Sequence, residues 1–122
     1  MTTICLNMIV KNESKIITRL FDTVLGIIDS YCICDTGSTD NTINIIKKYF
    51  DDKNIIGKII QEPFSSFSHN RNHALKECLG MSDYILLLDA DMCLNIKSFD
   101  KNTLKLDYYY ILQGSESFYY KN

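Results

Sequence analysis

Residues 31–50, YCICDTGSTDNTINIIKKYF, contain the transition that decides the fold. Tyr31–Cys34 is a short apolar segment typical of a buried strand, and the turn-forming residues Asp35–Asp40 follow it directly. Beyond them, apolar side chains recur with the spacing of one helical face, at Ile43, Ile45, Ile46, Tyr49 and Phe50. The segment therefore predicts a strand, a tight turn and a helix that is capped by Thr39 or Asp40.

The same alternation occurs on both sides of this segment. Further strands are predicted at Ile4–Val10, Ile55–Gln61 and Tyr84–Leu88, and further helices at Ile16–Ile28 and Ser68–Leu79. Strands that alternate with helices form a mostly parallel sheet with helices on both faces, so residues 1–122 are expected to form one Rossmann-like α/β domain. Because Tyr84–Leu88 is apolar throughout, we expect this strand to be buried on both faces.

The C-terminal part of the chain has a different pattern. Leu104–Leu112 and Ser117–Tyr120, on either side of Gln113–Ser115, predict a hairpin. The tyrosines of this region are Tyr108, Tyr109, Tyr110, Tyr119 and Tyr120. Tyrosines in strands are more often core or interface residues than the lining of a sugar-acceptor groove, and we interpret them in that way.

Composition and charge exclude several classes of protein. The net charge of −2 leaves no basic surface for nucleic acid, and the longest apolar runs are too short to span a membrane. The N-terminal residues do not resemble a secretory leader, which predicts a cytoplasmic protein. Five cysteines without a CxxC pair are expected to be reduced and structural, with Cys32 and Cys34 sharing a buried face.

The strongest chemical signal follows the last predicted strand. Asp89 and Asp91 are separated by Ala90 and come directly after an apolar strand, so two carboxylates lie where ligands bind in parallel sheets. A hard divalent cation with oxygen ligands would balance this charge, and the pair predicts a metal site. The alternative is that Asp89 caps a turn and Asp91 is solvated, because short motifs arise often by chance.

The turn after Tyr31–Cys34 carries a second candidate site. Gly37 allows a positive φ angle, Asp35 is placed to accept a hydrogen bond from a nucleotide base, and Ser38 offers a further polar group. An ordinary connection between a strand and a helix is an equally good interpretation of this spacing alone.

Two arginines and two histidines are the remaining candidates for site residues. Arg71 begins the third predicted helix, where a guanidinium group could hold Asp89 in place or contact a base carbonyl, whereas Arg19 is expected to be solvated. His69 and His73 share a helical face, but the sequence places no third ligand beside them. We therefore interpret the histidines as surface or packing residues.

Four segments together resemble the successive motifs of inverting family 2 glycosyltransferases, which have the GT-A fold. They are CLNMIVKNE at residues 5–13, DTGSTDNT at 35–42, FSHNRNHAL at 67–75 and LLLDAD at 86–91. They occur in the order and at the spacing of the family, and four ordered motifs are far more specific than any one of them.

The resemblance implies that the chain binds a UDP-sugar together with Mn²⁺ or Mg²⁺. Val10, Asn12 and Glu13 would border the uracil and ribose, and Asp35 with Gly37 and Ser38 would form the base pocket. Arg71 would line the base and phosphate side. Asp89 would contact the ribose or the metal, Ala90 would line the site, and Asp91 would bind the metal that bridges the diphosphate.

The resemblance ends after the Asp89–Asp91 segment. In the family, the acceptor site and the general base come from the half that follows it, and here 31 residues remain, with Asp107 and Glu116 as the available carboxylates. We expect the base and the site for a glycan, lipid or protein acceptor to come from a further C-terminal domain, or from a second copy that packs on the hairpin.

Three other interpretations compete with a complete transferase. The first is a module that binds a nucleotide sugar without turnover, or hydrolyses it slowly. The second is a phosphatase of the haloacid dehalogenase type, whose nucleophile strand resembles residues 84–91, although that motif usually opens the chain. The third, a nicotinamide-binding domain, is discarded because residues 7–13 contain no glycine.

Overall fold

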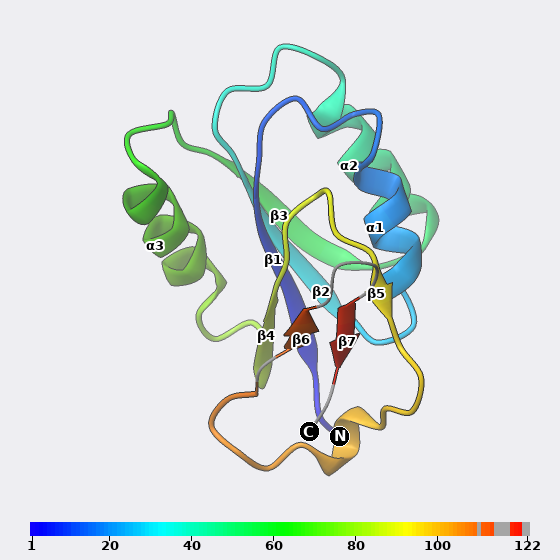
Figure 1. Ribbon diagram of the computed structural model, residues 1–122. Helices are drawn as coiled ribbons and strands as arrows, with labels where there is room; N and C mark the ends of the chain where they lie inside the picture. The colour runs from blue at the N-terminus through cyan, green and yellow to red at the C-terminus, as the bar shows by residue number, and fades with distance from the viewer. Residues whose placement is uncertain (110, 114–117, 121–122) are drawn as a thin grey trace.

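The computed structural model describes residues 1–109, 111–113 and 118–120 (Figure 1). Its elements are, in order, β1 (Ile4–Val10), α1 (Ile17–Val24), β2 (Ser30–Asp35), α2 (Thr42–Asp52), β3 (Ile56–Gln61), α3 (Phe67–Cys78), β4 (Tyr84–Leu87), β5 (Leu94–Asn95), the 3-10 helix η1 (Lys101–Thr103), β6 (Ile111–Gln113) and β7 (Phe118–Tyr120). The four strands and three helices predicted before residue 90 are therefore all present.

The main sheet has the order β3-β2-β1-β4, and all its strands are parallel. The chain builds outward from β1 through β2 to β3 and then returns to the other side of β1 to add β4. The order thus reverses at β1, and in parallel sheets ligands bind beyond the carboxyl ends of the strands at such a point. This topology confirms the predicted parallel sheet.

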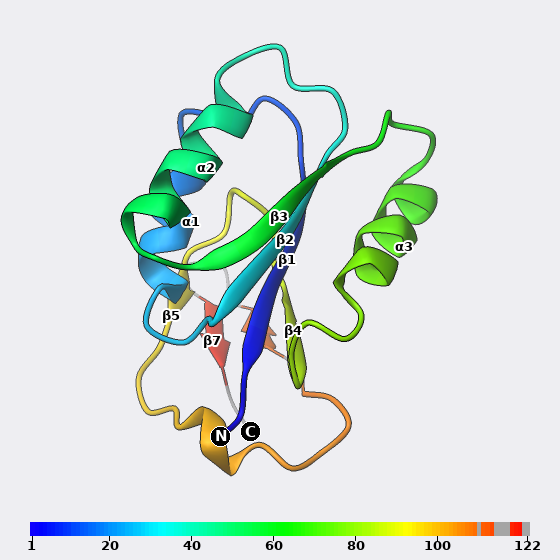
Figure 2. The ribbon, with the colours of Figure 1, turned by 180° about the vertical axis from the view of Figure 1, so that it is seen from behind.

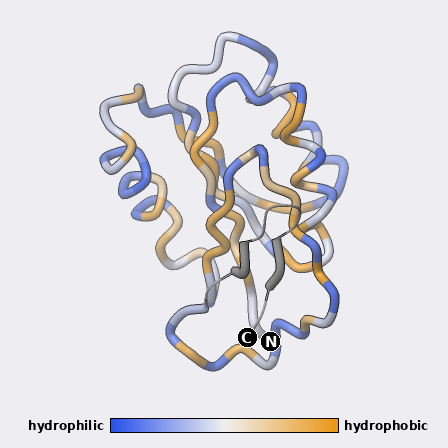
Figure 3. The backbone as a smooth tube through the Cα atoms, viewed as in Figure 1, coloured by the Kyte–Doolittle hydropathy of each residue, from blue (hydrophilic) through white to orange (hydrophobic). Residues whose placement is uncertain are grey.

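Helices cover both faces of this sheet, as predicted. α1 and α2 lie together on one face and α3 on the other (Figures 1 and 2). β1 faces both layers, because its side chains alternate: Leu6 and Met8 join the apolar core beneath α1, whereas Cys5 and Asn7 face α3. Figure 3 shows that the central strands are the most apolar part of the backbone.

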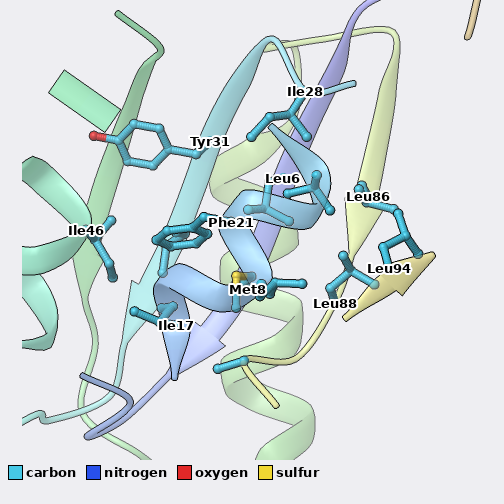
Figure 4. Packing of buried hydrophobic residues seen from close by; sticks show 14 of the residues in the cluster. Leu6, Met8, Ile17, Phe21, Ile28, Tyr31, Ile46, Leu86, Leu88 and Leu94 are labelled. Atoms are coloured by element: carbon cyan, nitrogen blue, oxygen red, sulfur yellow. The ribbon is translucent and has the colours of Figure 1, made fainter. Parts of the chain in front are cut away.

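The larger core contains a group of packed aromatic rings. The Phe50 ring lies 4.2 Å from the Tyr31 ring and 4.6 Å from the Phe21 ring, measured between centroids. Leu6, Met8 and Phe21 are fully buried beside them (Figure 4). Because α1, α2 and β2 each supply a ring, these contacts set the position of the two helices against the sheet.

The prediction that the fourth strand is buried on both faces is wrong. Leu86 is buried, but the neighbouring Leu87 is 44% exposed, and β4 lies at the edge of the sheet formed by the described strands. An apolar run shows that a strand can be buried on both sides. It does not show which segment covers each side.

The caps of the helices differ in detail from the prediction. The residue at the N-cap of α2 is Asn41, whose side chain makes no capping bond, while Asp40 accepts a hydrogen bond from the Thr42 N–H at 3.0 Å. Asp40, the residue before the N-cap, therefore stabilises the start of α2. In α3 the Ser66 side chain caps the helix by accepting from the His69 N–H at 3.0 Å.

The predicted hairpin is present but shorter. β6 and β7 pair in an antiparallel manner, yet the segment from Leu104 to Tyr109 forms no strand. β5 pairs in parallel with β7, a contact that the sequence did not predict. Tyr110 and Glu116, and the side chains of Tyr119 and Tyr120, lie outside the described residues, so the interpretation of these tyrosines stays a prediction.

All five cysteines are free thiols, and Cys32 and Cys34 are both buried, as the sequence predicted. Burial raises the pKa of the Cys32 thiol to about 11, which keeps it protonated and unreactive at neutral pH. No helix in the described part of the chain is long and apolar enough to cross a bilayer.

Candidate functional site

The loops that follow β1 and β2 are tied together at the carboxyl end of the sheet. Asn12 has a positive φ angle of 54°, and its side-chain oxygen accepts hydrogen bonds from the Thr39 N–H at 2.7 Å and the Asp40 N–H at 3.2 Å. The Asn12 N–H in turn donates to Ser38 Oγ at 2.9 Å. Asn12 and Ser38, both predicted to face the nucleotide, thus use these polar atoms to join the two loops.

Asp35 ends β2 and is only 2% exposed. Its Oδ1 atom accepts from the Gly37 N–H at 2.9 Å and from the Ser38 N–H at 2.8 Å, which holds the turn closed. Gly37 has φ of +129°, a conformation that other residues rarely adopt, so the glycine is needed as predicted. The Asp35 Oδ2 atom is buried and has no hydrogen-bond partner among the described residues.

Arg71 reaches from α3 to Asp89, two residues beyond the end of β4. Its Nη2 atom lies 3.0 Å from Asp89 Oδ1, so one of the two predicted roles, holding Asp89 in place, is present. The guanidinium also lies 5.5 Å from the centre of the Phe67 ring. Its Nη1 atom is buried and, within the described residues, donates to no acceptor. Buried polar groups in native proteins are nearly always paired, so this atom requires an explanation.

Asp91 is exposed, and Arg19 approaches it from α1. Arg19 Nη2 donates to the main-chain oxygen of Asp91 at 3.4 Å. Arg19 is exposed, in agreement with the predicted solvated position, and the contact with Asp91 is an addition to that prediction. No sequence signal could have identified this contact, because the two residues are 72 positions apart and α1 shows only which of its faces is apolar.

Carboxylates are concentrated between the loops after β1, β2 and β4. The pKa of Glu13 is raised, first by partial burial and then by the negative charges of Asp91, Asp40 and Asp89. The pKa of Asp40 is lowered to about 2 because Thr42 and Ser14 donate hydrogen bonds to it. The site therefore carries a negative potential that favours a bound cation.

The donor set fits a divalent cation only in part. In the described ranges, no three His, Cys, Asp or Glu side chains are grouped so that they could hold a metal ion by themselves. Asp89 is bound to Arg71 through one oxygen, which leaves its other oxygen and the exposed carboxylate of Asp91. Two carboxylates fit Mn²⁺ or Mg²⁺ where phosphate oxygens and water supply the remaining ligands, as is usual for Mg²⁺ bound with a nucleotide.

His69 and His73 do not extend this site. Their rings lie parallel, with centroids 6.3 Å apart, and both approach Glu62, at 3.9 Å and 3.4 Å respectively. The contact agrees with the interpretation of the histidines as surface residues. The sequence did not predict the contact of the two histidines with Glu62. This residue lies in the loop between β3 and α3 and approaches both rings.

A separate cleft lies beside β4. It has a volume of about 610 Å³ and is lined mainly by apolar side chains, among them Leu79, Leu87, Phe99 and Tyr108. Met92 also lines it, and the Met92 sulfur accepts from the Asp89 N–H at 3.4 Å, so the cleft begins behind the Asp89–Asp91 turn. Its polar lining residues include Ser82, Asp83 and Asp107.

Comparison with known proteins agrees with this geometry. The sequence profile described as "Glycosyl transferase family 2" matches residues 5–106, which is most of the chain. The chain belongs to glycosyltransferase family 2. The match includes the four strands of the main sheet, apart from Ile4, and the three segments that carry Glu13, Asp35, Asp89 and Asp91.

Curated relatives of this family 2 chain are longer than it is. An uncharacterized glycosyltransferase of Rickettsia felis is 32% identical over 83 residues, which are 68% of this chain and 26% of the relative. A TPR repeat-containing protein of Synechococcus elongatus is 31% identical over 108 residues, or 88% of this chain and 25% of the relative. The chain thus spans about a quarter of the length of these relatives.

Solved structures show the same fold. Residues 1–349 of TarS from S. aureus match with a TM-score of 0.63 and 25% sequence identity, over 76% of this chain and 28% of that one. The TarS fragment in complex with UDP matches with a TM-score of 0.60 and 24% identity. The Rossmann-like GT-A architecture predicted for the family 2 chain is therefore confirmed.

Proposed function

We propose that this chain is the donor-binding part of a glycosyltransferase that transfers a hexose from a UDP-sugar in the presence of Mn²⁺ or Mg²⁺. The observation that carries the proposal is the pair of buried, unpartnered polar atoms at the carboxyl end of the sheet. Asp35 Oδ2 is a hydrogen-bond acceptor and Arg71 Nη1 is a donor. A ligand that supplies the opposite groups would satisfy both.

Uracil has the required groups on one edge. Its N3–H donates a hydrogen bond, and the carbonyl oxygens on either side of it accept. The carboxylate of Asp35 suits the N3–H, and Arg71 Nη1 suits a carbonyl or a phosphate oxygen. Cytosine has no proton on N3, so a buried carboxylate would remain unpaired beside it. The UDP complex of the related TarS supports a uridine nucleotide.

Asp89 and Asp91 are the residues that would hold the divalent ion. An ion bound there supplies positive charge against the diphosphate that departs with the nucleotide. Arg71 holds Asp89 at 3.0 Å, which fixes one carboxylate before the nucleotide arrives. Val10, Asn12, Glu13, Gly37 and Ser38 would shape the pocket around the uridine, and Ala90 would keep the two carboxylates at their spacing.

We also propose that the acceptor site and the general base lie outside the part described. Asp107 borders the cleft and lies near Tyr84, whose pKa is raised first by desolvation and then by neighbours that include Asp107. Tyr84 begins β4, whereas the Asp89–Asp91 turn follows the other end of this strand. The base would come from a further domain or from a second copy of the chain, joined through the C-terminal hairpin by a two-fold contact. The acceptor is a glycan, lipid or protein hydroxyl.

A second candidate function is a nucleotide-sugar-binding module without transferase activity. The position of Asp107 favours it, because Asp107 lies beside the start of β4 and not at the donor site. A turnover assay with glycan, lipid and protein acceptors distinguishes the two. For either function we propose a cytoplasmic location, in which the five free thiols would stay reduced.

The test of the base pocket is discrimination between UDP and CDP. Titration calorimetry with Mn²⁺ should give tighter binding of UDP, and Asp35→Asn should weaken UDP and reduce the preference. A mismatched buried hydrogen bond costs about 1–3 kcal/mol, so UDP affinity should fall about tenfold or more. Circular dichroism of the variant controls for folding. Equal binding of UDP and CDP by the parent chain would remove this role from Asp35.

A further inference from the structure

The chain contains two arginines, and both contact the three-residue turn that follows β4. Arg71 approaches from α3 and binds the Asp89 carboxylate, whereas Arg19 approaches from α1 and binds the Asp91 main-chain oxygen. α1 and α3 lie on opposite faces of the sheet (Figures 1 and 2). The two guanidinium groups therefore flank the turn from both sides.

The two arginines differ in how far their charge is already neutralised. Arg71 forms an ion pair with Asp89 and is mostly buried. Arg19 is exposed and takes part in none of the ion pairs formed by the described residues. Its single bond, at 3.4 Å to a carbonyl oxygen, uses one of the five N–H donors of a guanidinium group.

The charge of the site explains why a second cation is needed. Partial burial first, and then the negative charges of Asp91, Asp40 and Asp89, raise the pKa of Glu13, so the three aspartates lie near enough to repel it. A nucleoside diphosphate adds further negative charge to this region. One divalent ion and the already paired Arg71 would leave the complex short of positive charge.

We propose that Arg19 is a further donor-binding residue, which contacts the terminal phosphate of the nucleoside diphosphate from the α1 side. This inference rests on the proposed function and assigns a ligand to a residue outside the four family-like motifs of the sequence. The planar guanidinium can keep its bond to the Asp91 carbonyl and donate a second bond to a phosphate oxygen. A lysine ammonium group would offer a single point charge and not this planar arrangement of N–H donors.

The fold does not depend on this side chain. α1 is anchored to the core by Ile17, Leu20 and Phe21, which are completely buried, while Arg19 lies on its exposed side. Removing Arg19 should therefore leave the stability nearly unchanged. A loss of binding in such a variant can then be attributed to the site and not to unfolding.

The test compares UDP with UMP, which lacks the terminal phosphate. Titration calorimetry with Mn²⁺ is performed on the parent chain, on Arg19→Ala and on Lys47→Ala. Lys47 is an exposed cation on α2, so its variant has the same change in net charge. Loss of a hydrogen bond to a charged group should weaken UDP binding by Arg19→Ala about tenfold or more. Its UMP affinity, and both affinities of Lys47→Ala, should stay within about twofold of the parent.

Each other outcome has a distinct meaning. Parent-like UDP affinity in Arg19→Ala overturns the inference, and so does an equal loss for UDP and UMP, which would place the contact away from the terminal phosphate. An equal loss in Lys47→Ala overturns it as well, because long-range attraction would then account for the effect. If the parent chain binds neither nucleotide, the proposed function itself fails, and the calorimetry shows this before any variant is made.

Discussion

The carboxyl end of the main sheet is built from polar side chains that hydrogen-bond to the neighbouring loops, whereas the cleft beside β4 is lined mainly by apolar side chains. Asp35 closes its turn through two N–H groups and still has a buried free oxygen. Leu87 lines the cleft and is exposed, and its side chain contains no polar atom that could bind a ligand.

The difference indicates that the two surfaces suit different kinds of partner. A cleft of about 610 Å³ offers apolar contact along an edge strand, and such edges commonly receive another polypeptide segment. The carboxyl end offers fixed hydrogen-bonding atoms and a negative potential, which select a small ligand by its chemistry. The two surfaces should therefore respond differently to substitution.

The largest effect is expected from Asp91→Ala at the carboxyl end. Asp91 is exposed and is not bound to Arg71, so its carboxylate is the one most available to a cation. The variant should lose the whole gain in UDP affinity that Mn²⁺ provides, while metal-free binding stays the same. Calorimetry with Mn²⁺ and with a chelator measures both. A folded variant that keeps the metal dependence would exclude Asp91 from the site.

A separate effect is expected from Leu87→Lys in the cleft. A charge on an exposed edge strand opposes pairing with another chain, so the variant should self-associate less than the parent, while UDP affinity stays unchanged. Light scattering and calorimetry give the two readouts. Ile56→Lys, on the exposed opposite edge strand β3, is the matched control.

Two results would contradict this division of roles. Loss of UDP binding in folded Leu87→Lys would mean that the cleft and the donor site are one surface. A parent chain that is strictly monomeric at high micromolar concentration would exclude the second copy and leave a further domain as the source of the acceptor site.

The smallest effect is expected from Glu13→Gln, as a change of stability with pH. Because the folded-state pKa of Glu13 is raised, ionised Glu13 destabilises the folded chain at pH values above that pKa. Below the unfolded value near 4.5, Glu13 is protonated in both states and the effect disappears. Glu13→Gln should thus raise Tm at pH 7 and leave it nearly unchanged at pH 4, as measured by thermal denaturation.

A Tm increase that persisted at pH 4 would contradict an electrostatic origin, since a neutral glutamine and a protonated glutamate carry the same charge. Added Mn²⁺ should reduce the difference at pH 7, because a cation beside Asp89 and Asp91 offsets the repulsion that Glu13 experiences.

Much of the fold was predictable because local patterns were unambiguous. Tyr31–Cys34 could only be a short strand, and Asp35–Asp40 contains too many turn-forming residues to continue it. The exposure of Leu87 was not predictable, because burial depends on which other segment covers a strand. Similarly, β5 pairs with β7, from which it is separated by more than twenty residues, and its two-residue length leaves no periodic pattern.

The sequence by itself determined the family motifs, the parallel strands and the position of Asp35, Asp89 and Asp91 after those strands, since each depends on neighbours within a few residues. Only the tertiary structure decided that Asn12 joins two loops, that Arg71 holds Asp89 and that Arg19 reaches the Asp91 carbonyl. The physical reason is the range of the interaction. Helix and strand periodicity is set by local backbone geometry, whereas a hydrogen bond between distant residues exists only when packing of the whole core places their atoms within about 3 Å.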